Sequence, residues 1–106
     1  MNYTVQFTTE AQDQLDEMEA FIAAAASAGV AAGYVDSIVT YCESLETFPE
    51  RGTRRDDLLP GLRITNYRHR AVIAFLVDTP TRTVSILSVF YGARDYESRF
   101  LDDLDK

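Results

Sequence analysis

The first third of the chain changes from a hydrophobic period of two to a helical period. Tyr3, Val5 and Phe7 alternate with polar residues, which predicts a short, half-buried strand. Apolar residues then recur at steps of three and four, which predicts an amphipathic helix with an acidic outer face; these residues are Ala11, Leu15, Met18, Ile22 and Ala25. Either Thr8 or Thr9 can cap this helix, and Thr9, followed three residues later by Gln12, fits a capping box.

A stretch of small residues from Ser27 to Gly33 predicts a corner that breaks the first helix. A second helical stripe follows, and its apolar members are Tyr34, Val35, Ile38, Tyr41, Cys42, Leu45 and Phe48. This helix is predicted to end at Pro49, because the residue before a proline disfavours the helical conformation. The two helices should therefore form a hairpin.

The second half of the chain returns to the strand pattern. Residues 62–67 alternate between apolar and polar, and residues 71–77 are almost continuously apolar, as in a central strand. Residues 83–91 carry apolar side chains on both parities, with Val84, Ile86 and Phe90 on one and Leu87, Val89 and Tyr91 on the other. Because the connections between these segments are short, antiparallel neighbours are favoured.

Together the segments predict a single α+β domain over residues 1–106. The element order is β-α-α-β-β-β, with the helical hairpin packed on a mostly antiparallel sheet. A chain of 106 residues is long enough for one compact core and too short for two domains. A short helix is expected over residues 95–106, with Phe100, Leu101 and Leu104 packing against the domain.

Charge divides the chain into an acidic first half and a basic middle. Residues 1–50 contain nine acidic residues and neither lysine nor arginine, whereas residues 51–93 contain seven arginines and three aspartates. The net charge of −7 discourages loose binding to nucleic acid. The middle segment is a candidate face for an anion or an acidic partner, and arginine suits planar contacts with carboxylate or phosphate.

Several kinds of site are not indicated by the sequence. Cys42 lies in the apolar stripe of the second helix and is interpreted as a core residue rather than a nucleophile. The acidic residues of the first helix lack the ligand alternation of a calcium loop, so no metal site and no cofactor are predicted. The longest uncharged run, residues 20–35, is shorter than the ~20 residues of a membrane span and contains glycine and serine.

Four phrases along the chain resemble the RelE/ParE superfamily of bacterial type II toxins, and within it the ParE branch. They are "VQFTTEAQDQLDEM", "CESLETFPERGTRRDDLLPGLRI", "YRHRAVIAFLV" and "VSILSVFYGARDYE". The resemblance extends from Tyr3 to Glu97, and its most specific parts are the Phe-Pro-x-Arg-Gly corner and the Pro-Gly-Leu-Arg entry to a strand.

This resemblance implies a cytoplasmic toxin that is neutralised by a co-encoded antitoxin of the ParD type. ParE-like toxins are associated with poisoning DNA gyrase, which would make this chain a protein-binding inhibitor rather than an enzyme. RelE-like toxins instead cut mRNA on the ribosome. A toxin fold that has lost its toxicity and survives as an antitoxin-binding module is the third hypothesis, and the acidity of this chain gives it weight.

The residues expected to contact the antitoxin or gyrase are Arg63, Arg68, Arg70, Tyr91 and Arg94. Arg51 is interpreted as structural, and Arg54 and Arg55 could pair with Asp56 and Asp57. The resembling motif commonly has histidine where this chain has Tyr91, and tyrosine titrates near 10 rather than near neutrality.

RelE-type cleavage would use Arg68, Arg70, Arg94 and Tyr91 around the scissile phosphate. The chain has one lysine, Lys106, at its end, and one histidine, His69. If residues 68–70 are part of a strand, alternation places His69 on the face opposite Arg68 and Arg70. This placement argues against a shared catalytic site.

Overall fold

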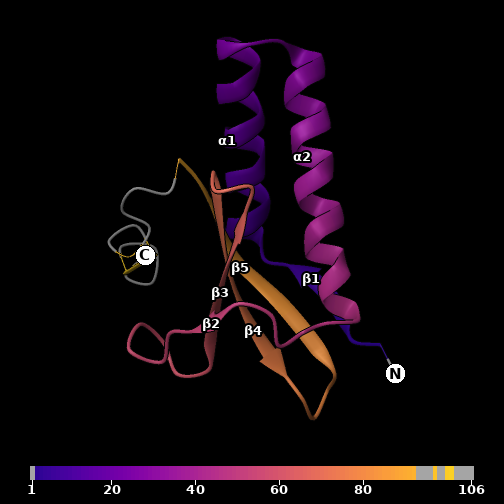
Figure 1. Cartoon of the computed structure of the whole chain (residues 1–106), viewed down its shortest axis with the longest axis vertical. Coiled ribbons are helices and arrows are strands. Elements are labelled where there is room, and N and C mark those ends of the chain that lie inside the picture. Colours follow the sequence, from indigo (N-terminus) through magenta and orange to yellow (C-terminus); the bar gives the residue numbers. More distant parts are fainter. Residues whose placement is uncertain (1, 93–96, 98–99, 102–106) are drawn as a thin grey trace.

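The computed structural model describes residues 2–92 together with Glu97, Phe100 and Leu101. Its elements follow one another as the sequence pattern predicts, with two small additions (Figure 1). They are β1 (Thr4–Phe7), α1 (Thr9–Ala25), α2 (Ala28–Glu43), the 3₁₀ turn η1 (Ser44–Glu46), β2 (Thr53–Arg54), β3 (Leu62–Tyr67), β4 (Ala71–Asp78) and β5 (Thr83–Tyr91). The additions are η1 and the two-residue strand β2.

The strands form one sheet in the order β1-β5-β4-β3-β2. β1 runs parallel to β5, and every other neighbouring pair is antiparallel. The two helices lie side by side and project beyond the sheet (Figure 1). The predicted α+β class and the helical hairpin on a mostly antiparallel sheet are therefore confirmed.

Both helices begin at side-chain caps. The cap of α1 is one of the two predicted threonines, and the cap of α2 corrects the predicted corner. Of the two predicted candidates, Thr8 caps α1, because its hydroxyl accepts a hydrogen bond from the backbone N–H of Ala11 at 3.1 Å. Ser27 caps α2 in the same way, accepting from Val30 N at 3.1 Å. The corner is consequently shorter than predicted, and Gly33 lies inside α2.

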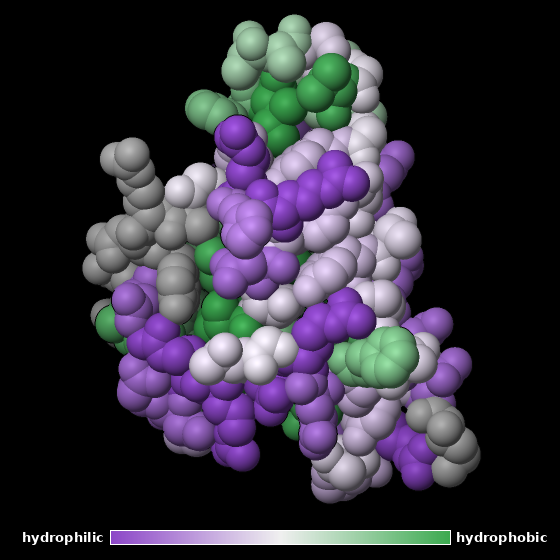
Figure 2. All heavy atoms as spheres, viewed as in Figure 1, coloured by the Kyte–Doolittle hydropathy of each residue, from purple (hydrophilic) through white to green (hydrophobic). Residues whose placement is uncertain are grey.

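The tip of this hairpin is apolar and uncharged. Residues 20–35 contain no charged side chain, and Phe21 and Val30 are 63% and 56% exposed. The corresponding end of the molecule is hydrophobic on the face shown in Figure 2. Among the described residues, no helix is long and apolar enough to cross a membrane.

A β-bulge in β5 explains why its apolar residues fall on both parities. Ala74 pairs with Ser88 and Phe75 pairs with Ile86, so Leu87 is an extra residue in β5. Because of the bulge, even-numbered residues of β5 face the helices before it and odd-numbered residues face them after it. Ile86 and earlier even positions face them before it, and Val89 and Tyr91 face them after it.

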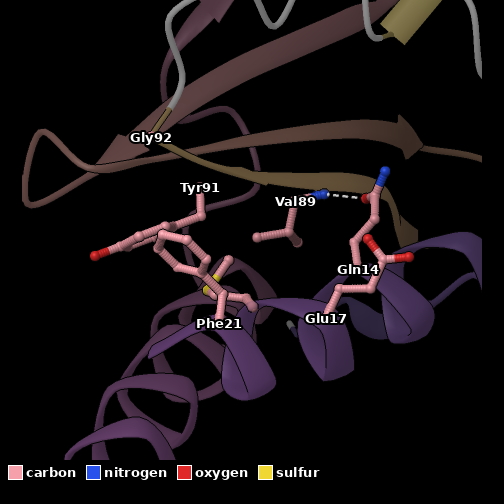
Figure 3. Close-up of a pocket in the computed structure, with 7 residues that line it drawn as sticks. Gln14, Glu17, Phe21, Val89, Tyr91 and Gly92 are labelled. Carbon is pink, nitrogen blue, oxygen red and sulfur yellow. Dashed lines mark hydrogen bonds between the residues drawn. The ribbon is translucent and has the colours of Figure 1, made fainter. Parts of the chain in front are cut away.

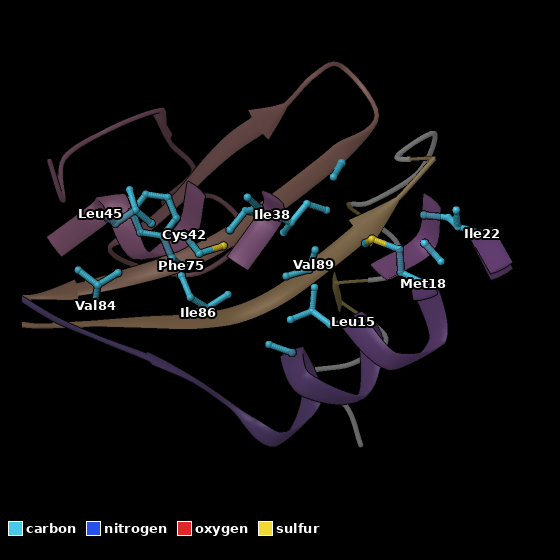
Figure 4. Close-up of a cluster of buried hydrophobic side chains, with 14 residues drawn as sticks. Leu15, Met18, Ile22, Ile38, Cys42, Leu45, Phe75, Val84, Ile86 and Val89 are labelled. Carbon is cyan, nitrogen blue, oxygen red and sulfur yellow. The ribbon is translucent and has the colours of Figure 1, made fainter. Parts of the chain in front are cut away.

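Each face of the sheet carries a hydrophobic cluster. The larger cluster lies between the sheet and the helical hairpin, and Figure 4 shows its side chains meeting from α1, α2 and the central strands. Cys42 is fully buried in this cluster, as predicted. The smaller cluster on the opposite face includes Phe90 and Phe100. Phe100 therefore packs as predicted, whereas Leu101 is 46% exposed, contrary to the prediction, and Leu104 lies outside the described residues.

Candidate functional site

Two tyrosines flank a small residue in one row across the end of the sheet. Ala71 of β4 pairs with Tyr67 of β3 on one side and with Tyr91 of β5 on the other. All three side chains face the helices, and Ala71 is fully buried. Tyr34 of α2 packs between the two tyrosines, with ring centroids 5.9 Å from Tyr67 and 5.6 Å from Tyr91. The small side chain of Ala71 leaves room for this ring.

The hydroxyl of Tyr34 is buried at the centre of this arrangement. It has no hydrogen-bond partner among the described residues. Its burial raises the pKa of Tyr34 above the ordinary value, and the neighbouring Tyr91 and Tyr67 raise it further. Arg70 and Arg68 oppose the shift, because positive charge favours the ionised phenol.

The turn between β3 and β4 presents two arginines beside the tyrosines. Arg68 and His69 both have positive φ angles, +50° and +58°, as in a type I′ turn. Arg68 places its guanidinium carbon 5.2 Å from the centre of the Tyr67 ring. Arg70 accepts a backbone hydrogen bond from Gly92 at 2.7 Å, which ties the end of β5 to the turn.

This turn contradicts the prediction that residues 68–70 alternate within a strand. Strand β3 ends at Tyr67 and β4 begins at Ala71, so Arg68, His69 and Arg70 form the connection. His69 therefore lies in the same exposed turn as the two arginines rather than on an opposite sheet face.

The structure separates the five predicted contact residues. Arg68, Arg70 and Tyr91 come together at one end of the sheet. These three residues, with Tyr34 and Tyr67, are called the hairpin-end site, after the β3–β4 hairpin. Arg63 lies apart from them and donates to the backbone oxygens of Glu50 and Arg51 at 2.7 and 3.0 Å. Arg94 lies outside the described residues. The contact role of all five stays a prediction.

Sequence reasoning missed the two tyrosines that complete the site. Tyr34 belongs to the apolar stripe of α2, which indicates a core residue. Tyr67 begins the phrase "YRHRAVIAFLV" but is not among the predicted contact residues. The position of Tyr67 at the end of a strand was the signal that could have found it. Tyr67 and Tyr91 each end a strand that borders the central apolar segment, so a correct register would have placed them in one row.

The arginines between α2 and β3 have structural partners. Arg51 donates to Ser44 Oγ at 3.0 Å and stacks on the rings of Tyr41 and Phe48, which agrees with its structural interpretation. Ion pairs link Arg54 to Asp56 at 3.1 Å and Arg55 to Asp57 at 2.8 Å, and Arg55 also pairs with Glu97.

The loop from Arg54 to Gly61 is closed by one of these carboxylates. Asp56 accepts a hydrogen bond from the backbone N–H of Gly61 at 2.7 Å. This bond, followed by the contact with Arg54, lowers the pKa of Asp56. The arginines of this loop therefore shape the chain before β3.

An open groove adjoins the hairpin-end site. It has a volume of about 340 Å³ and lies between α1 and the end of β5, lined by Gln14, Glu17, Met18, Phe21, Val89, Tyr91 and Gly92. Figure 3 shows the rings of Phe21 and Tyr91 lying against each other at one end of the groove, and their centroids are 5.9 Å apart. The groove is mainly apolar and joins the site through Tyr91.

The groove exists because β1 is shorter than β5. β1 ends at Phe7, which pairs with Ile86, so this edge of β5 is not covered by a strand beyond that point. Gln14 of α1 bonds to β5 beyond this point, and its side-chain oxygen accepts from Val89 N at 2.7 Å (Figure 3).

The chemistry of the hairpin-end site is that of hydrogen-bond donors and positive charge. Guanidinium groups donate only, and phenols donate readily to anions. No group of three or more metal-ligating side chains occurs among the described residues. Cys42 lies far inside the core, where burial raises its thiol pKa to about 12. The arrangement can bind an anionic group next to an apolar surface.

Comparisons with solved structures show a shared fold. A chain of the chromosomal ParDE toxin–antitoxin system from Pseudomonas aeruginosa superposes with a TM-score of 0.72 at 20% identity, covering 84% of this chain and 95% of that one. A chain of a RelBE toxin–antitoxin complex from Mycobacterium tuberculosis gives a TM-score of 0.62 at 23% identity, covering 86% and 99%. A mutant of the Escherichia coli toxin RelE in the free state gives 0.66 at 11% identity, covering 98% of each chain.

The family assignment comes from the sequence comparison. No curated protein matches the chain. The sequence pattern of the ParE toxin of the type II toxin–antitoxin system parDE matches residues 5–96, which is most of the chain and includes both helices and every strand residue of the hairpin-end site. The chain therefore belongs to the ParE toxin family of type II toxin–antitoxin systems.

Proposed function

We propose that this ParE-family toxin inhibits DNA gyrase by binding it, and that a co-encoded ParD-type antitoxin neutralises it in the bacterial cytoplasm. The observation that carries the proposal is the hairpin-end site. Arg68 and Arg70 stand exposed there without an ion-pair partner among the described residues, next to the apolar groove at Phe21 and Tyr91. Exposed charge beside an uncovered aromatic surface is typical of a protein-binding face.

The proposed inhibition needs no catalytic chemistry from this chain. A gyrase-binding toxin would act by holding the enzyme on cleaved DNA, so contact with DNA would occur only through gyrase or the antitoxin. The acidic face of α1 supports this route, because Asp13, Asp16 and Glu17 are exposed and would repel a free nucleic acid.

A supercoiling assay with purified gyrase tests the proposal. We expect the toxin to inhibit supercoiling and to cause cleaved DNA to accumulate, and we expect the antitoxin to relieve both effects. Arg70→Gln should weaken the inhibition. Arg82→Gln is the matched control, because Arg82 is also exposed, and its turn joins the opposite ends of β4 and β5. Normal supercoiling at micromolar excess of toxin would contradict the gyrase target.

Ribosome-dependent mRNA cleavage is a second candidate, and the position of His69 favours it. His69 shares the turn with Arg68 and Arg70, so an imidazole and two guanidinium groups occur together near Tyr91. Such a set can transfer a proton and stabilise a phosphate. Cleaved transcripts on translating ribosomes, lost in His69→Gln, would establish this activity in place of gyrase inhibition.

A non-toxic antitoxin-binding module is the remaining alternative from the sequence. Expression of the chain without antitoxin separates it from both toxins. Arrested growth supports a toxin, whereas normal growth of cells that contain the folded protein would contradict toxicity.

A further inference from the structure

The hairpin-end site contains donor groups that the protein itself leaves without partners. The side chains of Arg51, Arg54, Arg55 and Arg63 all bond within the described residues. By contrast, Arg68 and Arg70 form no side-chain hydrogen bond or ion pair with any described residue. The buried Tyr34 hydroxyl is likewise without a partner among the described residues.

A neighbouring tyrosine shows how a phenol hydroxyl between α2 and the sheet can find a hydrogen-bond partner within the protein. Tyr41 lies about two turns further along α2, and its hydroxyl is 2.9 Å from Thr65 Oγ1 of β3. A buried polar group without a partner destabilises the folded state. Tyr34 therefore carries an unmade hydrogen bond at a position where its neighbours are two more phenols and two arginines.

We propose that the hairpin-end site binds a carboxylate of an acidic peptide segment, and that the Tyr34 hydroxyl donates a hydrogen bond to that carboxylate. Arg68 and Arg70 supply the charge, and Tyr67 and Tyr91 form the walls. The carboxylate would replace part of the surface that covers the hydroxyl. The nearby arginines are exposed at the turn, and their long side chains can change rotamer without a backbone movement.

The surroundings favour a peptide over a nucleic acid. The apolar groove beside Tyr91 fits a hydrophobic side chain from the same peptide, with Phe21, Met18 and Val89 as its walls. A nucleic acid carries closely spaced phosphates, and they would face the acidic side chains of α1, including Glu17 at the groove itself. One carboxylate next to one apolar residue meets both parts of the surface.

This inference rests on the proposed function, because the acidic segment is assigned to the co-encoded antitoxin. It goes beyond that function by naming a buried hydroxyl as a recognition group. Besides donating a hydrogen bond in the complex, the hydroxyl would favour binding by destabilising the free toxin. A group that destabilises the free toxin becomes satisfied only in the complex, so its removal should affect the two states in opposite directions.

Two conservative variants test the inference. In Tyr34→Phe, the free toxin should melt about 4 °C or more above the wild type, since an unsatisfied buried hydroxyl is removed. The same variant should bind the purified antitoxin about tenfold more weakly, since a hydrogen bond to a charged group is lost. Tyr41→Phe is the matched control. It should lower the melting temperature, because it breaks the bond with Thr65, and leave the affinity unchanged.

The outcomes separate this inference from the proposed function. If the wild type binds the antitoxin and Tyr34→Phe binds equally well, the inference is overturned while the toxin–antitoxin function stands. If the wild type does not bind the antitoxin, both are overturned. A melting temperature lowered in Tyr34→Phe would show that the hydroxyl is already satisfied, and this also overturns the inference. Tyr34-dependent binding of single-stranded RNA in place of the antitoxin would transfer the site to a nucleic acid and overturn the peptide assignment.

Discussion

Gly52 occupies a backbone position at which a side chain has no room. Its φ angle is +81°, and a Cβ atom added there would lie 2.2 Å from the carbonyl oxygen of Ile64. The close approach allows the corner after Pro49 to reach β3, where Arg63 then binds the corner's carbonyl groups. Glycine at this position therefore has a steric cause.

Gly52→Ala should lower the free energy of unfolding by at least about 2 kcal/mol, because the clash adds to the strain of a positive φ. Urea denaturation followed by circular dichroism measures this change. Gly29→Ala is the control, since Gly29 lies in α2 with no atom within 4 Å of an added Cβ. That variant should gain about 0.5–1 kcal/mol from helix propensity. Equal stability of the two variants would contradict the account.

Cys42, again a single residue, gives a prediction about how stability depends on pH. Burial raises its thiol pKa to about 12, so the folded protein keeps the proton that an unfolded chain loses near 9. Proton release then favours the unfolded state, and this contribution to stability is lost as the pH rises from about 9 toward 12. A thiol reagent at pH 8 should react slowly with the native protein and rapidly in denaturant. Fast native labelling would show that the thiol is not buried as described.

At the scale of elements, the end of β5 depends on a side chain from α1. Gln14 accepts from Val89 N at the point where β1 no longer covers the strand. Gln14→Met keeps a similar volume but cannot accept this bond well, so a buried N–H would be left unsatisfied. We expect a loss of about 1–3 kcal/mol in denaturant unfolding.

Gln12→Met is the matched control for this variant. The side chain of Gln12 is exposed and donates to Phe7 O from the surface, where water can replace it. Its loss should change stability by less than about 0.5 kcal/mol. A similar cost for both variants would mean that the bond to β5 has no special weight.

The elements were predictable from the sequence to the extent that local patterns decide them. The helical hairpin and three main strands follow from hydrophobic period, and their confirmation covers most of the core. The parallel pairing of β1 with β5 joins residues about eighty positions apart, and no local pattern encodes it. In the sequence, the bulge at Leu87 is indicated only by apolar residues at both odd and even positions of β5. Alternation alone does not show which residue is the extra one.

The candidate site was predictable in part, for the same reason. The residue types drew attention to Arg68, Arg70 and Tyr91, and the structure brings these three together. The alternation assumed through residues 68–70 was wrong because a tight turn with two positive φ angles is favoured by Asn-Gly rather than Arg-His. The sequence pattern alone does not assign Tyr34 to the site, because the apolar stripe of α2 indicates only a buried helix face. Its place between Tyr67 and Tyr91 depends on tertiary packing.

At the scale of the whole molecule, the charged and uncharged surfaces divide by region. The outer face of α1 is acidic, and the tip of the helical hairpin is uncharged and hydrophobic (Figure 2). The unpaired positive charge among the described residues at the hairpin-end site lies beside the apolar groove. The proposed acidic, partly apolar partner would meet complementary groups at this surface.

The turn at Arg68 and His69 supports the proposal that the hairpin-end site serves binding. Two residues with side chains are held at positive φ, where Asn-Gly would fit with less strain. Strain of this kind is typical of functional positions. Replacing both residues by Asn-Gly should therefore stabilise the fold and remove a positive charge and an imidazole from the proposed binding surface.

The most direct test is the affinity of the antitoxin for the double variant Arg68→Asn/His69→Gly, measured beside the stability of the free protein. We predict that the free energy of unfolding rises by about 1 kcal/mol and that the dissociation constant increases about tenfold. Weaker binding by a more stable protein excludes misfolding as its cause. An unchanged dissociation constant would show that the partner binds elsewhere and would contradict the assignment of the hairpin-end site.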